Sequence, residues 1–365
     1  MKKITTLAVT AASLLLAAPL LTAVTTDPVG AQKHTFKDGS DTAISAPLHS
    51  SAAFVGVVGT SGLSGFTITP SGTPGWAANQ FTDSPHYIIF TSGTREGLFY
   101  TVTANTTDSI TVEDIGDGDL ATQGIVDGDG FTVIPFWTLN TLFPDGEGFI
   151  VSSDVFNPDG VIFFTNSGTS GVNLPFDSSY LYHDGSQGAA GWYKVGSLGD
   201  GLQNDLPLPP DAYYVVRNNS GADVEMVLAG SVQMANFATI VSRLEDGSSQ
   251  DVFIANSFPV ATTLAESGLA TSPAFTPSPD VFNPLDVVFV FDNDTVGINK
   301  PLGSSYLYHD GSQGAAGWYQ IGNLGAGLQD DVEVFQPGQG FVIRKAAGLA
   351  ESEIWMAQAP YLDNS

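Results

Sequence analysis

Apolar and polar residues alternate in short segments along most of this chain, and turn residues separate one segment from the next. The two-residue period predicts β-strands, and the close spacing of the turns predicts an all-β fold of the sandwich or barrel class. The clearest predicted strands cover residues 42–48, 54–58, 66–69, 86–91, 97–104, 109–113, 130–135, 213–217, 341–345 and 353–357. Residues 224–234 and 237–244 fit strands with some helical character, and residues 31–41 form a polar stretch.

The stretch SSYLYHDGSQGAAGWY occurs twice without a change, at residues 178–193 and 304–319. The segment DVFNP also recurs, at residues 154–158 and 280–284, again 126 positions apart. Further on, GLQND at 201–205 matches GLQDD at 327–331, and after one inserted residue 213–217 matches 340–344. This period exceeds the roughly 20–50 residues of a solenoid repeat and suits a small domain.

The duplication therefore predicts tandem β units with short strands and turns rich in glycine, proline and aspartate. We expect an N-terminal β unit at residues 24–135 and two repeat units at residues 136–250 and 251–365. A fainter third copy lies in the first unit, where residues 87–91 resemble residues 162–165 and residues 130–134 resemble residues 340–343.

The repeated stretch predicts a hairpin with a long loop at residues 186–191, rich in glycine and alanine. On one interpretation the loop projects, and aromatic residues beside it form a platform for a sugar ring. The ligand-binding candidates are then Trp192, Tyr193 and His183 in the first copy and Trp318, Tyr319 and His309 in the second. On the other interpretation, Trp192 and Tyr180 form a cross-strand pair in the core, and the loop is only a connection.

The chain begins with a basic start and an apolar run up to Ala23, a pattern typical of a secretory signal peptide at residues 1–23. No later stretch reaches the roughly 18 continuous apolar residues of a membrane helix. We therefore expect an exported protein in the periplasm, on the outer surface or outside the cell. With no cysteine in the chain, such a protein depends on burial of its core rather than on disulfides.

The formal net charge is −27, and 29 of the 38 acidic residues are aspartate. This acidity argues against nucleic acid as a partner, because nucleic-acid sites need basic surfaces. Aspartate is a turn residue and glutamate a helix former, so the excess of aspartate agrees with an all-β chain.

An acidic, glycine-rich stretch at residues 114–129 is a candidate metal site. Carboxylate oxygens on a flexible loop suit calcium, although the spacing is not that of an EF-hand. The candidate ligands are Asp114, Asp117, Asp119, Asp127 and Asp129. The alternative is a series of solvated β-turns.

The sequence contains no pattern that requires catalysis. It has no H-E-x-x-H motif, no G-x-S-x-G elbow and no thiol nucleophile. A glycosidase would need two carboxylates facing each other across a cleft, and nothing in the sequence singles out such a pair. The dipeptide His183-Asp184 recurs as His309-Asp310, but adjacent residues of a strand point to opposite faces, which favours the rim of a turn.

Several ordered segments resemble an uncharacterised secreted family with many paralogues in verrucomicrobial genomes. They include SGTPGWAANQF at 71–81, FTSGTREGLFYTVTANT at 90–106, PFWTLNTLFP at 135–144 and GFVIRKAA at 340–347. The resemblance spans essentially the whole mature chain and implies export. It implies no activity, cofactor or catalytic residue. In that family the hairpin is shorter than here, where residues 186–191 lengthen it.

Export, tandem β units, acidity and the lack of a catalytic pattern favour a non-enzymatic protein of the cell surface or periphery. Its expected role is structural, adhesive or glycan-binding, with extracellular polysaccharide or envelope components as partners. The alternative is a secreted hydrolase of polysaccharide, which several carboxylates at the floor of a deep groove would distinguish.

Overall fold

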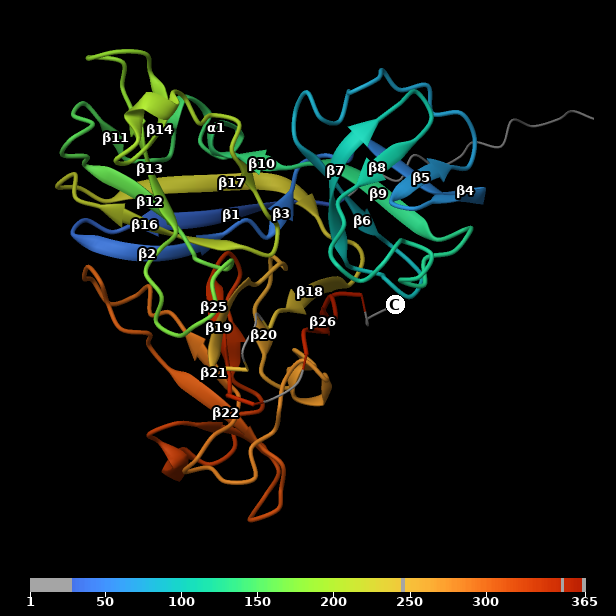
Figure 1. Cartoon of the computed structure of the whole chain (residues 1–365). Helices are drawn as coiled ribbons and strands as arrows, with labels where there is room; N and C mark the ends of the chain where they lie inside the picture. Colours follow the sequence, from blue (N-terminus) through green and yellow to red (C-terminus); the bar gives the residue numbers. More distant parts are fainter. Residues whose placement is uncertain (1–27, 244–246, 349–350, 363–365) are drawn as a thin grey trace, which may run out of the picture.

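The computed structural model describes residues 28–243, 247–348 and 351–362, and nearly all of its regular structure is β-strand (Figure 1). The all-β prediction is confirmed. The helical elements within these ranges are one turn of α-helix, α1 (Leu139–Leu142), and the 3₁₀ turns η1 (Pro144–Gly146), η2 (Leu198–Asp200), η3 (Leu269–Thr271) and η4 (Leu324–Ala326). None of the described helices has the length and apolarity needed to cross a membrane. The predicted signal peptide, residues 1–23, lies outside the described residues.

The first compact part is a closed six-stranded barrel, which we call the barrel unit (residues 50–136). Around the barrel the order is β4-β5-β8-β7-β6-β9. The strands are β4 (Phe54–Ser64), β5 (Thr67–Pro70), β6 (His86–Phe90), β7 (Phe99–Asn105), β8 (Ile110–Val112) and β9 (Gly130–Pro135). Its interior is filled by alternate apolar side chains, among them Ile88, Tyr100 and Phe131.

The second part, unit A, comprises residues 28–49 and 137–235, so the barrel unit is inserted within it. Its main sheet has the order β11-β13-β12-β16-β2, and β14 pairs with the free side of β13. These strands are β2 (Ser40–Ser45), β11 (Val151–Ser152), β12 (Gly160–Phe164), β13 (Ser178–His183), β14 (Gly191–Lys194) and β16 (Tyr213–Asn218). A second sheet has the order β1-β17-β3, from β1 (Val29–Phe36), β17 (Val224–Val232) and β3 (Leu48–His49); β10 (Trp137–Thr138) pairs with β15 (Pro207–Leu208).

The third part, unit B (residues 236–362), has a main sheet of order β19-β25-β21-β22-β23. Its strands are β19 (Gln250–Ala255), β21 (Val287–Val290), β22 (Ser305–His309), β23 (Gly317–Gln320) and β25 (Gly340–Lys345). Two smaller pairs complete it: β18 (Phe237–Val241) with β26 (Glu353–Ala357), and β20 (Thr262–Thr263) with β24 (Glu333–Phe335).

All three parts contain the same order of strand pairing. The order β4-β9-β6-β7-β8 in the barrel unit corresponds to β2-β16-β12-β13-β14 in unit A and to β19-β25-β21-β22-β23 in unit B. This agrees with the faint third copy expected at residues 87–91 and 130–134, which coincide with β6 and β9. The fold is therefore built on one five-stranded arrangement used three times.

The strand pairing groups the chain differently from the predicted ranges 24–135, 136–250 and 251–365. Strands β1 and β2 lie before the barrel in sequence, but β1 pairs with β17 and β2 pairs with β16 of unit A. Strand β18 pairs with β26 and so belongs to unit B. Continuous sequence ranges do not match the units here, because an edge strand of a sheet can be separated from the other strands by an inserted domain.

Units A and B pack together through the outer faces of their main sheets, a contact that we call the seam (Figure 1). Its buried apolar residues are Ala43, Tyr213 and Val215 from unit A and Ala255 and Val342 from unit B. Every residue of β2 is buried although the sequence of β2 is mostly polar, because one face lies on the core of unit A and the other on the seam.

Two matched ion pairs flank the seam. In unit A, Arg217 Nε lies 2.7 Å from Asp41 Oδ1, and Arg217 also donates to Asn299 of unit B at 2.7 Å. In unit B, Arg344 Nε lies 2.7 Å from Asp251 Oδ1, and Arg344 donates to Asn173 of unit A at 2.8 Å. Each unit thus completes the other unit's ion pair, which is the reciprocal contact of a two-fold dimer within one chain.

Candidate functional site

Each repeat unit places its hairpin loop beside the segment that contains DVFNP. We call residues 152–160 with 183–193 loop pair A, and residues 278–286 with 309–319 loop pair B. The two segments of a pair meet through a short parallel contact, Ser152 with His183 in unit A and Ser278 with His309 in unit B.

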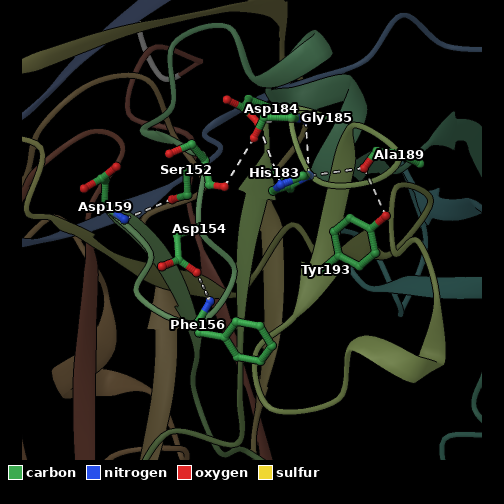
Figure 2. Close-up of polar contacts among 11 residues, drawn as sticks. Ser152, Asp154, Phe156, Asp159, His183, Asp184, Gly185, Ala189 and Tyr193 are labelled. Atoms are coloured by element: carbon green, nitrogen blue, oxygen red, sulfur yellow. Dashed lines mark hydrogen bonds and ion pairs between the residues drawn. The ribbon is translucent and has the colours of Figure 1, made fainter.

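Hydrogen bonds hold the two segments together in the same way in both units, and Figure 2 shows loop pair A. The backbone N–H of Asp184 donates to the carbonyl of Ser152 at 3.1 Å, and Asp310 donates to Ser278 at 3.1 Å. The hydroxyl of Ser186 donates to the carbonyl of Ser153 at 3.3 Å, and that of Ser312 to the carbonyl of Pro279 at 3.1 Å. The hairpin loop is therefore anchored at its first residues.

The DVFNP segment forms a tight turn that presents a phenylalanine to solvent. Asp154 Oδ1 accepts the N–H of Phe156 at 2.9 Å, and Asp280 Oδ1 accepts that of Phe282 at 2.9 Å. Such a turn is typical of aspartate two residues before the donor, and the following Asn-Pro ends the segment. Phe156 and Phe282 are each 85% exposed, the highest exposure of any large apolar side chain described. In the sequence, DVFNP indicates only the register of the repeat, and nothing in it predicts that these phenylalanines are exposed.

The predicted residues Tyr193 and His183 order the hairpin loop from its inner side. Tyr193 Oη donates to the carbonyl of Ala189 at 3.0 Å, and its ring lies edge-on to His183 with centroids 6.2 Å apart. His183 is buried, and its Nδ1 accepts the N–H of Gly185 at 3.2 Å.

Tyr319 and His309 repeat this arrangement in unit B. Tyr319 Oη donates to the carbonyl of Ala315 at 3.0 Å, and the ring centroids of His309 and Tyr319 are 6.2 Å apart. The two tyrosine rings are half-buried, so each keeps one part of its surface open to a ligand.

Loop pair B encloses a pocket of about 190 Å³. Phe282, His309 and Tyr319 line it, together with Gly314 from the hairpin loop and Leu324 from η4. The pocket thus brings two predicted ligand-binding residues, His309 and Tyr319, together with Phe282, which was not predicted from the sequence. It combines aromatic faces with the polar side chains of Asp280 and Gln313, which suits a small ring with hydroxyl groups.

The structure corrects the prediction for Trp192 and Trp318. Both indoles are 0% exposed and lie inside the cores of their units. Trp192 packs on Phe149 and on Tyr182, with ring centroids 4.7 and 5.6 Å away. A fully buried ring has no face for a sugar, so the geometry supports the core interpretation of these tryptophans.

The carboxylates beside the hairpin loops are not suited to act as general acids. The side chain and the backbone N–H of Ser186 lower the pKa of Asp184, and those of Ser312 lower the pKa of Asp310. A general acid of a glycosidase needs a raised pKa. These two side chains are therefore hydrogen-bond acceptors at neutral pH.

The five aspartates proposed for calcium do not converge. Asp114, Asp119 and Asp129 each accept a backbone N–H within their own loop, from Gly116, Thr122 and Val126. Asp117 Oδ2 lies 3.3 Å from Arg95 Nη1, and Asp127 accepts a hydrogen bond from the backbone N–H of Ser61. Among the described residues, no three His, Cys, Asp or Glu side chains are close enough together to hold a metal ion. The stretch is explained by turn chemistry instead.

A hydrolase would need several carboxylates at the floor of a deep groove, and the largest pocket described does not provide them. This pocket in unit B has a volume of about 680 Å³ and contains one carboxylate, Glu266, which accepts a hydrogen bond from the hydroxyl of Thr263. Removal from water raises the pKa of Asp211 to about 6, but Asp211 belongs to neither loop pair nor to this pocket.

Comparisons of this chain with protein-family models, with curated proteins and with solved structures found no match. The resemblance to a secreted verrucomicrobial family therefore stays a prediction.

Proposed function

We propose that this protein is exported and acts without catalysis at the cell surface or periphery, where it binds polysaccharide in a structural or adhesive role. The observation that supports this proposal most is the repeated loop pair. Each copy presents a phenylalanine that is 85% exposed, and in unit B this residue shares a pocket with Tyr319. Aromatic rings next to hydrogen-bond acceptors suit sugar rings, whose faces are apolar and whose edges are polar.

The test is a binding screen of the purified mature chain against a glycan array and isolated cell envelopes. The informative variant is Phe156→Ala combined with Phe282→Ala. Both side chains are exposed, so we expect the free energy of unfolding to change by less than about 0.5 kcal/mol while binding falls at least tenfold. Val227→Ala, at a 65% exposed position on β17, is the matched control and should bind as the wild type does.

Variants of the two buried tryptophans are a second control, because they should change stability rather than a binding surface. Trp192→Ala or Trp318→Ala should lower the free energy of unfolding by about 3–5 kcal/mol, because each removes a fully buried indole. A double phenylalanine variant that binds like the wild type would refute the assignment of the site.

A further inference from the structure

We infer that loop pairs A and B are two equivalent binding sites at opposite ends of one rigid body, and that the protein bridges separate chains of a neutral polysaccharide. This inference rests on the proposed function. It adds the number of sites, their direction and the charge class of the ligand.

The equivalence of the sites follows from their geometry rather than from sequence identity alone. Three distances agree between the units. The Asp–Phe hydrogen bond of the turn is 2.9 Å in both, the Tyr–His ring centroids are 6.2 Å apart in both, and the backbone hydrogen bond that anchors the hairpin is 3.1 Å in both. The exposed phenylalanines also have the same exposure. Two sites with one geometry should bind one ligand with similar affinity.

The charge of both loop pairs indicates a neutral ligand. Residues 152–160, 183–193, 278–286 and 309–319 contain no lysine or arginine. They do contain ionised carboxylates, and lowered pKa values keep Asp184 and Asp310 charged at neutral pH. A polyanion such as a uronate or sulfated polymer would meet repulsion with no counter-charge inside these segments, whereas the hydroxyl groups of a neutral sugar can donate to these oxygens.

The two sites face away from each other. In unit A the loop after β12 reaches unit B through Asn173, and β13 then runs from Ser178 away to the hairpin at His183. A strand of six residues spans about 17 Å. The same holds for Asn299 and β22 in unit B. Figure 1 shows β13 and β14 at one end of the molecule and β22 at the other, with the seam between them.

The seam fixes the two sites relative to each other. It combines a buried apolar cluster with two ion pairs, in which Asp41 and Asp251 are nearly buried. Sites on one concave face could hold a single polymer chain at two points. Sites at opposite ends cannot easily do so, and they join two chains or two particles instead.

The test uses beads coated with single neutral polysaccharides: a β-1,3-glucan, a β-1,4-glucan, a mannan and a galactan. Alginate beads provide the polyanion control. We expect wild-type protein, shown to be monomeric by sedimentation, to bind and agglutinate at least one neutral type and to leave alginate dispersed. Phe156→Ala alone and Phe282→Ala alone should each keep binding at about half the stoichiometry and lose agglutination. The double variant should not bind.

The outcomes separate this inference from the function on which it rests. Binding without agglutination, or agglutination by both single variants, would overturn the bridging and leave the binding function intact. Binding to alginate in preference to all neutral beads would overturn the ligand class. Failure of the wild type to bind any bead, neutral or alginate, would overturn both proposals.

Discussion

Units A and B share one strand order and one hairpin, but different residues occupy one end of their main sheets: a buried ion pair in unit B and uncharged residues in unit A. In unit B, Asp286 and Lys345 form a buried ion pair, and Asp286 also accepts the N–H groups of Thr276 and Ala346. The equivalent positions in unit A are Gly160 and Asn218. A side chain at Gly160 would collide with Ile150, which is buried and replaces Thr276 of unit B.

The comparison teaches that a duplicated sheet tolerates a change of polarity in its core when every polar group keeps a partner. Asn218 satisfies its amide by donating to the carbonyls of Phe36 and Ala222, both at 2.8 Å. Lys345 does so through Asp286 and the carbonyl of Ala274. The loop pairs, in contrast, have kept one geometry in both units. The core differs while the exposed loops agree, which favours a shared role for the loops.

The largest expected effect is the loss of the buried ion pair. Asp286→Ala leaves the Lys345 ammonium without a counter-charge, and we expect a loss of about 3–5 kcal/mol in the free energy of unfolding. Asn218→Ala, the matched change in unit A, removes neutral hydrogen bonds and should cost about 1–3 kcal/mol. Urea unfolding measures both.

A transplant sharpens this comparison. Replacing three residues of unit B by their unit A equivalents, Thr276→Ile, Asp286→Gly and Lys345→Asn, should recover more than half of the stability lost in Asp286→Ala. If Asp286→Ala costs less than about 1 kcal/mol, the ion pair is not what stabilises this end of unit B.

The second largest expected effect is a change of stability with pH, caused by a histidine at the contact between units A and B. His34 of β1 lies against Gly338, its Nε2 has no hydrogen-bond partner, and burial lowers its pKa to about 4. Between pH 6.5 and 4 the unfolded chain binds a proton that the folded chain does not. Stability is therefore complete above about pH 6.5 and falls as the pH drops, by about 3 kcal/mol for this one group.

Urea midpoints from pH 4 to pH 7.5 measure this dependence. His34→Leu should remove this group's contribution to the slope between pH 6.5 and 4. Burial also lowers the pKa of His86 in the barrel unit, which adds a slope of the same sign, whereas the raised pKa of Asp211 adds one of the opposite sign. An unchanged slope in His34→Leu would exclude the proposed cause.

The smallest expected effect concerns the centre of the seam, where equivalent positions of the two units have side chains of very different size. Tyr213 of unit A and Gly340 of unit B hold equivalent positions, and a Cβ at Gly340 would lie 2.0 Å from Tyr213 Cγ. Gly340→Ala should therefore cost about 1–3 kcal/mol by overpacking. Exchanging the two residues, Tyr213→Gly with Gly340→Tyr, should restore part of that loss if the seam has two-fold symmetry. A swapped chain less stable than Gly340→Ala would argue against that symmetry.

Much of the fold could be predicted from the residues. The apolar runs that predicted strands at 86–91 and 213–217 correspond to β6 and β16, which are buried on both faces, and the alternation at 130–135 corresponds to β9. Strand β1 was missed because its sequence VGAQKHTF is largely polar: its burial alternates from residue to residue, but apolar and polar residues do not. Its partner β17 lies about 190 positions away, and no local pattern reveals such a pairing.

The candidate site was predicted only in part. The repeat pointed to the hairpin and to Tyr193 and Tyr319, which do lie at the loops. It could not decide whether Trp192 faces ligand or core, because an aromatic residue at the start of a returning strand fits both. The exposure of Phe156 and Phe282 depends on a turn set by Asp154 and Asp280, whose direction only the surrounding sheet defines.

By itself, the sequence determined the all-β class and the duplication with its register. These properties depend on local pattern and composition. The tertiary structure decided that the barrel unit interrupts unit A, that two units meet across a two-fold seam, and that the tryptophans are buried while two phenylalanines face solvent. Those features depend on contacts between residues far apart in the chain, and on which face of each strand another sheet happens to cover.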